Sequence, residues 1–333
     1  MIGTSDGLRL DIGVNPMNEF TQSIPLGHTD LQVTSLGIGT WAWGDRRTWG
    51  YGRTYAEADL QAAFESSLAA GIDLFDTAEI YGGGQSELLL GRFMKTAQQR
   101  VVVATKFMPY PWRLRRGNLL RALRRSLDRL GLTQVDLYQI HWPFPPRSIE
   151  TWVDELAKVV ESGLVRAAGV SNYSAEQTRR AHAVMARHGI VLASNQVEYS
   201  LLKRSPERNG VMQTCRELGI TLIAYSPMAM GVLSGKYTSQ NPPRGMLRSS
   251  RFSREYLARI QPLIGLLREI GQAHDGRNPA QVALNWVMCK GAVPIPGAKN
   301  ARQAQENVGA LGWRLSEDEI ASLNAASDRV GTK

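Results

Sequence analysis

Short apolar runs alternate with amphipathic segments along most of this 333-residue chain. The run at 72–75 follows a helix-like stretch that stops at Gly71, which is typical of a buried strand. Runs of this kind predict eight strands, at 36–40, 72–76, 101–105, 135–140, 164–170, 191–197, 220–225 and 292–296. Segments with helical periodicity predict helices at about 56–70, 85–97, 118–130, 148–162, 174–188, 206–218, 278–290 and 301–310.

Signals at the helix ends support this alternation. Two residue pairs fit capping boxes, Ser174 with Gln177 and Ser316 with Glu319. Asn278 fits an N-cap that is followed by a proline. Glycines stand where three helices should stop, at Gly131, Gly163 and Gly189. Strand–helix pairs with short connections favour an α/β fold of the (β/α)8 TIM barrel type over an open sheet.

Further elements flank the predicted barrel. The segment 24–34 predicts a β-hairpin, and extra helices are predicted at 253–275 and 316–326. Residues 1–20 are polar and lack both a hydrophobic signal core and a transit-peptide composition, so we expect a poorly structured N-terminal extension. No linker, low-complexity tract or repeat divides the rest, and 21–333 is expected to form a single domain.

The segment 37–42 matches the dinucleotide fingerprint G-x-G-x-x-A, with Glu57 about 20 residues further on. In that fingerprint the glycines open a helix, because the pyrophosphate binds at the helix N-terminus. Here they open the segment 43–52, which has no helical period. We therefore interpret 37–42 as a strand end and not as a Rossmann turn.

The net charge of +9 comes from 39 Lys and Arg against 30 Asp and Glu. On the helix predicted at 118–130 the leucines face inward, which leaves a basic outer face of Arg121, Arg124, Arg125 and Arg129. No aromatic residues are interleaved with these arginines, so a solvated face is favoured over a nucleic-acid surface. The excess of positive charge would also help to attract a polyanionic cofactor.

The composition suits a folded protein, with 43% hydrophobic residues. No apolar run approaches the roughly 20 residues that span a bilayer, so no membrane segment is expected. Cys215 and Cys289 stand in apolar, helix-like surroundings, which indicates buried thiols in a reducing compartment more than a disulfide or a metal site. We expect a cytoplasmic protein without a metal, and the sequence does not indicate its oligomeric state.

Four residues able to pair charges or move protons follow neighbouring predicted strands. Asp76 and Tyr81 follow the second strand, Lys106 the third and His141 the fourth. The C-terminal ends of the strands form the active site of a TIM barrel. Alone, Lys106 could snorkel, Tyr81 could pack and His141 could be a core imidazole. Together at one rim they favour a catalytic site.

The chemistry of these residues suits a phenol that acts as a proton donor. A tyrosine has an unperturbed pKa of about 10, too high for an efficient acid near neutrality, and an adjacent ammonium should lower it. Lys106 would supply the ammonium and Asp76 its counter-charge. His141 would polarise a substrate carbonyl beside Tyr81. A site that protonates a developing alkoxide also needs a hydride donor facing it.

Several motifs resemble the aldo-keto reductase family. They are FDTAEIYG at 75–82, TK at 105–106, HWP at 141–143, GVSNY at 169–173 and IPGAKN at 295–300. The resemblance covers about 24–327 and implies a (β/α)8 barrel, NADPH as the cofactor and a small carbonyl compound as the substrate. It also implies a catalytic tetrad of Asp76, Tyr81, Lys106 and His141, with Tyr81 as the acid.

The resemblance implies cofactor contacts from several strand ends. Ser171, Asn172 and Gln196 match positions that hold the nicotinamide carboxamide, and Tyr225 matches the aromatic residue that stacks on the nicotinamide. Lys299 matches the loop around the adenosine phosphate, where a lysine suits a 2′-phosphate and favours NADPH over NADH. The remaining matched positions are Thr40, Trp41, Asp76 and Lys236, then Ser226, Pro227, Met228, Gly231 and Leu233 along the pyrophosphate, and Gly297, Gln303, Glu306 and Asn307 in the adenosine loop.

Two further stretches, MPYPWRL at 108–114 and GALGW at 309–313, resemble the plant-plastid and cyanobacterial branch of the family, which includes pyridoxal reductase. Asp73 replaces the usual asparagine of the family, and we expect a local hydrogen-bond exchange with little functional effect. Aromatic residues near the rim predict an aromatic-walled pocket, although they could equally pack on one another. The predicted substrate contacts are Trp43, Tyr81, Tyr110, Trp112, His141 and Trp142.

Three functions remain open on the sequence. The first is NADPH-dependent reduction of aldehydes or ketones. The second is a cofactor-sensing regulatory subunit, because the family's potassium-channel β subunits keep the barrel and the tetrad. The third is a barrel aldolase with a Schiff base on Lys106, which needs a lowered lysine pKa, whereas Asp76 should keep the amine charged. The substrate, whether pyridoxal, a reactive aldehyde or another carbonyl, stays open, and a basic cluster could bind an anionic substrate or be solvated: Arg113, Arg115 and Arg116.

Overall fold

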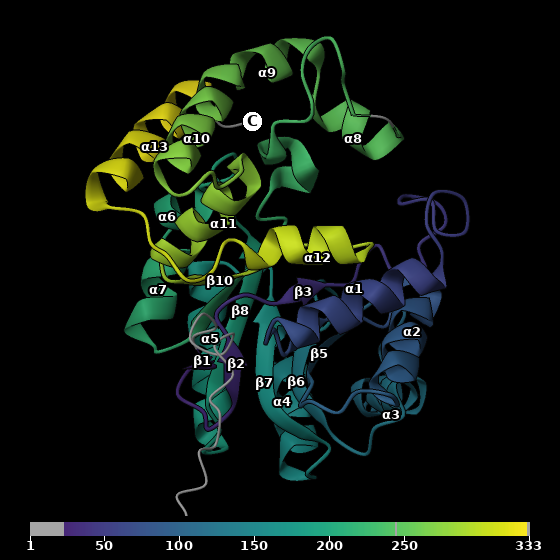
Figure 1. Ribbon diagram of the computed structural model, residues 1–333. Helices are drawn as coiled ribbons and strands as arrows, with labels where there is room; N and C mark the ends of the chain where they lie inside the picture. The colour runs from purple at the N-terminus through teal and green to yellow at the C-terminus, as the bar shows by residue number, and fades with distance from the viewer. Residues whose placement is uncertain (1–22, 244, 332–333) are drawn as a thin grey trace, which may run out of the picture.

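The computed structural model describes residues 23–243 and 245–331 (Figure 1). The predicted N-terminal extension at 1–20 lies outside the described residues. Eight strands form one parallel sheet: β3 (Ile38–Gly39), β4 (Leu74–Asp76), β5 (Val102–Phe107), β6 (Val135–Ile140), β7 (Val165–Ser171), β8 (Leu192–Glu198), β9 (Thr221–Tyr225) and β10 (Ala292–Ile295). The two edges of the sheet meet, because Gly39 N donates to Pro296 O at 3.0 Å and Gly39 forms a parallel bridge with Gly297. The predicted TIM barrel is confirmed.

Helices cover the outside of the barrel (Figure 1). Those that lie close to their predicted places are α1 (Glu57–Ala69), α2 (Gln85–Met94), α3 (Asn118–Leu130), α4 (Ile149–Glu161), α5 (Ala175–Arg187), α11 (Pro279–Cys289), α12 (Ala301–Val308) and α13 (Glu317–Val330). The side chains of Ser174, Asn278 and Ser316 cap α5, α11 and α13, as predicted. No helix opens directly after β3, and α1 begins only at Glu57, so the rejection of the Rossmann turn is also confirmed.

Two predicted helices are divided in the structure. The helix predicted at 206–218 is α6 (Ser205–Arg208) and α7 (Val211–Glu217), because Gly210 between them adopts a left-handed φ of 81°. The helix predicted at 253–275 is α9 (Arg254–Arg259) and α10 (Gln261–Ala273), because Pro262 is tolerated only in the first turn of a helix. A short helix before them, α8 (Met246–Arg251), has no counterpart in the prediction.

The predicted hairpin is confirmed as the antiparallel pair β1 (Ser23–Pro25) and β2 (Gln32–Thr34). Its apolar residues Leu26, Leu31 and Val33 are fully buried against inward-facing residues of the strands, so the hairpin closes the N-terminal end of the barrel. Thr34 N donates to the Oδ1 of Asp73 at 2.8 Å. The expected local hydrogen bond at Asp73 is therefore present.

Alternation along the strands divides their residues between two layers. Outward residues such as Phe75 and Val103 pack with the helices, and inward residues such as Leu74 and Val102 fill the barrel. Towards the C-terminal ends, the positions two residues further on carry polar groups: Asp76 after Leu74, Lys106 after Ala104, Gln139 after Leu137 and Tyr225 after Ile223. One end of the barrel interior is therefore polar.

Candidate active site

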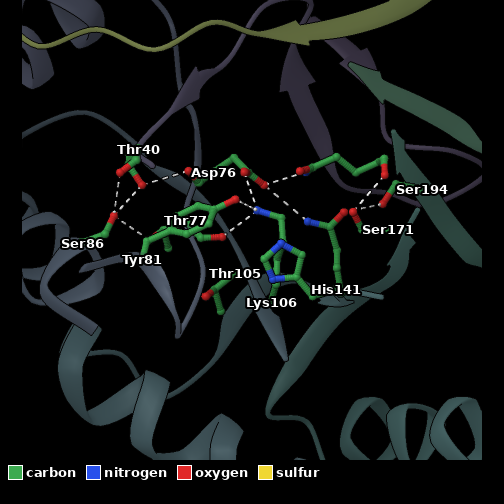
Figure 2. A network of polar contacts seen from close by, with 12 residues as sticks. Thr40, Asp76, Thr77, Tyr81, Ser86, Thr105, Lys106, His141, Ser171 and Ser194 are labelled. Atoms are coloured by element: carbon green, nitrogen blue, oxygen red, sulfur yellow. Dashed lines mark hydrogen bonds and ion pairs between the residues drawn. The ribbon is translucent and has the colours of Figure 1, made fainter. Parts of the chain in front are cut away.

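The carboxylate of Asp76 lies at the centre of a buried polar network (Figure 2). Lys106 Nζ donates to Asp76 Oδ1 at 2.5 Å, and the two side chains are 0% and 4% exposed. The other carboxylate oxygen accepts from Gln196 Nε2 at 2.8 Å and from Gln139 Nε2 at 3.4 Å. Lys106 is thus the counter-charge that a buried carboxylate requires, and the structure brings these two predicted residues together.

The hydroxyl groups of Thr40, Thr77 and Ser86 form hydrogen bonds around the backbone of Asp76, at the end of β4. Thr40 Oγ1 donates to Asp76 O at 2.9 Å and lies 2.7 Å from Ser86 Oγ. Thr77 Oγ1 donates to Ser86 Oγ at 2.9 Å, and Figure 2 shows these contacts as dashed lines. Thr40 is fully buried and its hydroxyl supports the backbone of Asp76. Its predicted contact with the cofactor stays a prediction.

Tyr81 follows β4 and opens a short 3-10 helix, Tyr81–Gly84 (η2). The two glycines after it have left-handed φ values of 58° and 67°, which sharpen the turn. Lys106 Nζ lies 3.5 Å from the Tyr81 hydroxyl oxygen and donates at 2.8 Å to Thr77 O. The ammonium therefore contacts both the Asp76 carboxylate and the phenol, as the sequence predicts.

His141 follows β6 and meets Tyr81 edge-on, with ring centroids 5.9 Å apart. Its Nδ1 is buried and has no hydrogen-bond partner within the described part of the chain. Burial lowers the pKa of His141 to about 3, and the nearby charge of Lys106 acts in the same direction. The imidazole is therefore neutral near neutrality, with one nitrogen able to donate a hydrogen bond.

The predicted lowering of the Tyr81 pKa is wrong in this structure. Burial raises the pKa of Tyr81 well above its usual value, and the Asp76 carboxylate raises it further. Burial also lowers the pKa of Lys106. The carboxylate of Asp76 has the opposite effect, because it favours the charged ammonium. The ammonium lies 2.5 Å from the carboxylate and 3.5 Å from the phenol, so its charge acts mainly on Asp76. Tyr81 is therefore protonated near neutrality, as an unperturbed phenol also is. The raised pKa makes it a weaker acid than the sequence predicts, so its proton passes only to a strong base such as a developing alkoxide.

The predicted carboxamide contacts lie together at the ends of β7 and β8. Ser171 Oγ donates to Gln196 O at 2.9 Å, and Asn172 Nδ2 donates to Ser171 Oγ at 3.0 Å. Tyr225 OH donates to Asn172 Oδ1 at 3.0 Å. Asn172 has a φ of 63°, a strained conformation of the kind that collects at functional sites. These four side chains form one patch, which reaches Asp76 through Gln196.

The segment after β9 has an uncommon backbone. Ser226, Ala229 and Met230 have φ values of 51°, 48° and 56°, and Gly231 follows at 90° within the 3-10 segment Ala229–Ser234 (η3). Residues in this conformation can form concave N–H nests that bind anions. The other predicted pyrophosphate contacts are buried or half-buried parts of the same turn: Pro227, Met228 and Leu233.

Three cations lie near one another, namely Lys236 after β9, Arg248 on α8 and Lys299 after β10. None of them forms a salt bridge with a described carboxylate. Lys299 Nζ lies 4.9 Å from the ring centroids of both Trp49 and Tyr55, and the Arg248 guanidinium lies 5.5 Å from the Trp49 ring. Burial lowers the pKa of Lys299 to about 8, and the charges of Arg248 and Lys236 act in the same direction. Like charges held this close favour the binding of an anion.

The adenosine loop predicted at 297–307 is compact. Gln303 Oε1 accepts from Lys299 N at 3.0 Å, and Asn307 Nδ2 donates to Gly297 O at 3.5 Å. Glu306 instead pairs with an arginine one turn earlier on α12. Of the residues predicted to contact the adenosine, Gln303 therefore lies against Lys299 and Asn307 lies against Gly297. The Glu306 carboxylate forms a separate ion pair.

Trp43 does not line the mouth of the barrel, contrary to the prediction. It is fully buried, and its ring packs 6.3 Å from that of Phe75 and 5.6 Å from that of Phe93. The loop after β3 has no regular period, so the sequence could not tell which tryptophan turns inward. Trp41 is the one near the site, with its ring centroid 6.5 Å from that of Tyr81.

The other predicted substrate residues belong to the loops after β5 and β6. Tyr110 stacks on Trp112, with centroids 4.5 Å apart, and Trp112 is 71% exposed. Trp142 stacks on Phe144, with centroids 5.5 Å apart. The aromatic residues therefore pack on one another in pairs, and their contact with a substrate stays a prediction.

Two charged residues escaped the sequence reasoning. Glu87 is fully buried; it accepts from Thr105 Oγ1 at 2.6 Å and pairs with Arg129 at 2.6 Å. Arg129 therefore does not belong to the solvated face on which it was predicted. A carboxylate among the apolar residues of the helix at 85–97 was the signal for such a partner. Arg248 was missed because it lies on α8, which no pattern predicts.

Both cysteines are free thiols at the opposite end of the barrel, where they line a cavity of about 700 Å³ beside the starts of β9 and β10. Burial raises the pKa of Cys215 to about 12, so this thiol is not a nucleophile. Within the described ranges no cluster of His, Cys, Asp and Glu could hold a metal ion. The helices of the same ranges include none that combines the length and the apolar character needed to cross a bilayer.

A closed parallel barrel with its polar groups at the C-terminal strand ends is the architecture of TIM-barrel enzymes. Residues 35–328 match the family described as the Aldo/keto reductase family. The chain belongs to that family, whose members are in general oxidoreductases that act on carbonyl groups with nicotinamide cofactors.

Individual relatives agree with this assignment. The chloroplastic pyridoxal reductase of Arabidopsis thaliana is 45% identical over 320 residues, which cover 92% of this chain and 86% of the relative. An uncharacterized oxidoreductase of Mycobacterium tuberculosis is 40% identical over 299 residues, 89% of this chain and 90% of the relative. A thermostable aldo-keto reductase crystallised with the inhibitor epalrestat has a TM-score of 0.75 at 31% identity, covering 92% of this chain and 99% of its own. The glycerol dehydrogenase of Gluconobacter oxydans has a TM-score of 0.82 at 26% identity, with 93% and 96% covered.

Proposed function

We propose that this protein reduces an aldehyde or ketone to the alcohol with NADPH and that Tyr81 donates the proton. The observation that carries the proposal is the buried chain in which Asp76 pairs with Lys106 at 2.5 Å and Lys106 lies 3.5 Å from the Tyr81 hydroxyl oxygen. During carbonyl reduction the substrate oxygen becomes negative. A protonated phenol beside a buried cation is suited to meet that charge.

Each residue of the tetrad has a distinct part in the proposal. NADPH supplies the hydride when it is bound. Neutral His141 donates a hydrogen bond to the carbonyl oxygen and directs it towards Tyr81. Tyr81 is protonated near neutrality and gives its proton to the substrate oxygen as that oxygen becomes negative. Lys106 then stabilises the phenolate that remains, and Asp76 holds the ammonium in place.

Two groups of residues suit the binding of NADPH. The turn at 226–231 contains four left-handed residues and is of the kind that forms phosphate-binding nests, although the N–H groups of Ala229 and Gly231 donate within the turn. The cations Lys236, Arg248 and Lys299 suit the additional phosphate of NADPH. Burial and then the charges of Arg248 and Lys236 lower the Lys299 pKa, and a phosphate would offset that repulsion. NADH brings no anion to that place, so NADPH is the preferred cofactor in this proposal.

The two alternative functions make different demands on the same residues. An aldolase needs an accessible amine; burial does lower the Lys106 pKa, but Nζ is fully buried and donates to Asp76, Thr77 and Tyr81. A cofactor-sensing subunit would keep the same barrel and tetrad, so turnover is the property that separates it from a reductase.

We also propose that the substrate is a small carbonyl compound, neutral or charged. The protein has no nucleic-acid or membrane partner in this proposal. One relative is named as a pyridoxal reductase, so pyridoxal is the first compound to test. The free thiols Cys215 and Cys289 suit a reducing compartment, and we propose the cytoplasm. Fractionation of the source cells tests that location.

The experiment is a substrate panel with the purified full chain. Pyridoxal, an aromatic aldehyde and an aliphatic aldehyde are incubated with NADPH, and the loss of NADPH and the appearance of the alcohol are measured together. Deuterium from NADPH labelled at the transferred position should appear on the alcohol carbon. Tight NADPH binding without turnover of any compound would instead support the regulatory subunit. Borohydride trapping of a carbonyl on Lys106 would support the aldolase.

A further inference from the structure

Glu79 and Arg113 form an ion pair that the proposed chemistry does not use. Arg113 Nη1 lies 2.6 Å from Glu79 Oε1, and Arg113 Nη2 lies 3.1 Å from Glu79 Oε2. The Glu79 side chain is 9% exposed and that of Arg113 is 19% exposed. A two-pronged contact of this kind fixes both the distance and the relative orientation of the two groups.

The pair joins two segments that each carry a residue of the tetrad. Glu79 stands two residues before Tyr81, and its Oε1 also accepts from Met108 N at 2.7 Å, two residues after Lys106. The backbone N–H of Glu79 donates to Lys106 O at 3.4 Å. The loop after β4 and the loop after β5 are therefore linked both through the backbone and through one carboxylate.

Arg113 also holds the outer part of the second loop. Its Nη1 donates to Met108 O at 2.9 Å, and its guanidinium lies 4.8 Å from the Phe107 ring centroid and 5.4 Å from that of Tyr110. Tyr110 in turn stacks on Trp112. Because the loop surrounds the guanidinium, its shape depends on where Arg113 is held.

These contacts decide an alternative that the sequence left open for Arg113. Both Nη atoms donate to the Glu79 carboxylate, which also balances the positive charge. The guanidinium is thus already paired and is not offered to an anionic substrate. Its place is structural, between the two catalytic segments.

We propose that Glu79 and Arg113 are positioning residues that form a clip between the loop 107–114 and the segment of Tyr81. The clip sets the width of the substrate entrance and the place of the Tyr81 hydroxyl. This inference rests on the proposed reductase function. Misplacement of reacting groups by about 1 Å can cost about 10²-fold in rate, so loss of the clip should lower kcat/KM.

Two variants break the clip in different ways. Glu79→Gln keeps the shape of the side chain and an acceptor for Met108 N but removes the charge. Arg113→Lys keeps the charge but cannot make the two-pronged contact. The matched control is Glu207→Gln, because Arg204 and Glu207 form another two-pronged pair, with side chains 9% and 14% exposed, beside α13.

The kinetic measurement compares a small aliphatic aldehyde with a large aromatic one. For both clip variants, kcat/KM with the aromatic aldehyde should fall about 10- to 100-fold, with a smaller fall for the aliphatic aldehyde. The NADPH dissociation constant should stay within about twofold, since the clip lies apart from the cofactor contacts. Glu207→Gln should lose thermal stability without this change in selectivity. Clip variants with wild-type kinetics, or a control with the same kinetic loss, would overturn the proposal.

A second measurement does not depend on turnover. Trypsin can cleave after Arg113 in the clipped loop and after Arg115 and Arg116 directly beyond it. In Glu79→Gln this cleavage should be about tenfold faster than in wild type and in Glu207→Gln, because the loop opens more often. Equal cleavage rates would contradict the clip. A wild-type protein that reduces no carbonyl would contradict the reductase function alone, and the cleavage rates would still decide the clip.

Discussion

Replacing Lys299 with alanine should separate the two nicotinamide cofactors. The Lys299 ammonium forms no salt bridge with a described carboxylate and lies in the field of Arg248 and Lys236, so a phosphate is its natural partner. A hydrogen bond to a charged group is worth about 1.5–3 kcal/mol. At 1.36 kcal/mol per factor of ten, that is about 10- to 150-fold in the dissociation constant. Because Arg248 remains, we expect the lower part of this range, about 10- to 30-fold for NADPH.

NADH lacks the 2′-phosphate, so its dissociation constant should change by less than about twofold. Quenching of tryptophan fluorescence measures both cofactors, and Trp49, 4.9 Å from Lys299 Nζ, lies where it can report binding. Lys299→Arg should keep most of the NADPH affinity. Lys95→Ala, at the exposed C-terminal end of α2, controls for the loss of one positive charge. Equal losses for NADPH and NADH, or no loss for either, would refute the assigned phosphate site.

Three other outcomes follow from the same contacts. Lys106→Met should bind NADPH but lose most reductase activity, and a near wild-type kcat contradicts the proton relay. Urea denaturation should show a free energy of unfolding about 3–5 kcal/mol lower, because Asp76 stays buried without its partner. NADPH affinity should fall about five- to tenfold between about pH 7 and pH 9, because Lys299 has a pKa of about 8 and loses its positive charge in this range. The same fall in Lys299→Ala would show that Lys299 does not cause it. Trp43→Phe should lower the free energy of unfolding by about 1–3 kcal/mol and leave the KM for aldehydes unchanged, since the ring lies in the core. A KM several-fold higher would indicate that Trp43 contacts the substrate.

The tetrad could be placed from the sequence because two regularities agree. Asp76, Lys106 and His141 each follow a short apolar strand, and a barrel brings the C-terminal ends of its strands to one rim. Alternation along β4 and β5 then turns Asp76 and Lys106 inward. The need of a buried carboxylate for a cation predicts their pairing, which the 2.5 Å contact confirms.

Contacts between distant residues and the effects of burial leave little trace in the sequence. Helical periodicity places Arg129 on a solvated face, but Glu87 on the neighbouring helix draws it into an ion pair. The residue types around Tyr81 suggest a lowered pKa, whereas burial outweighs an ammonium 3.5 Å away. The glycine at position 210 gives only a weak signal inside a helical pattern, although its left-handed φ divides the helix.

Turnover of the variant Tyr81→Phe shows whether Tyr81 gives the proton. The variant keeps the ring and removes only the hydroxyl, so its NADPH dissociation constant should stay close to wild type. Its kcat should fall about 10²- to 10⁴-fold, or about 3–5 kcal/mol of barrier. NADPH deuterated at the transferred position shows whether hydride transfer limits kcat, because slow cofactor release can mask a chemical defect. A variant that keeps more than about half of the wild-type kcat, with hydride transfer shown to be rate-limiting, would exclude Tyr81 as the proton donor.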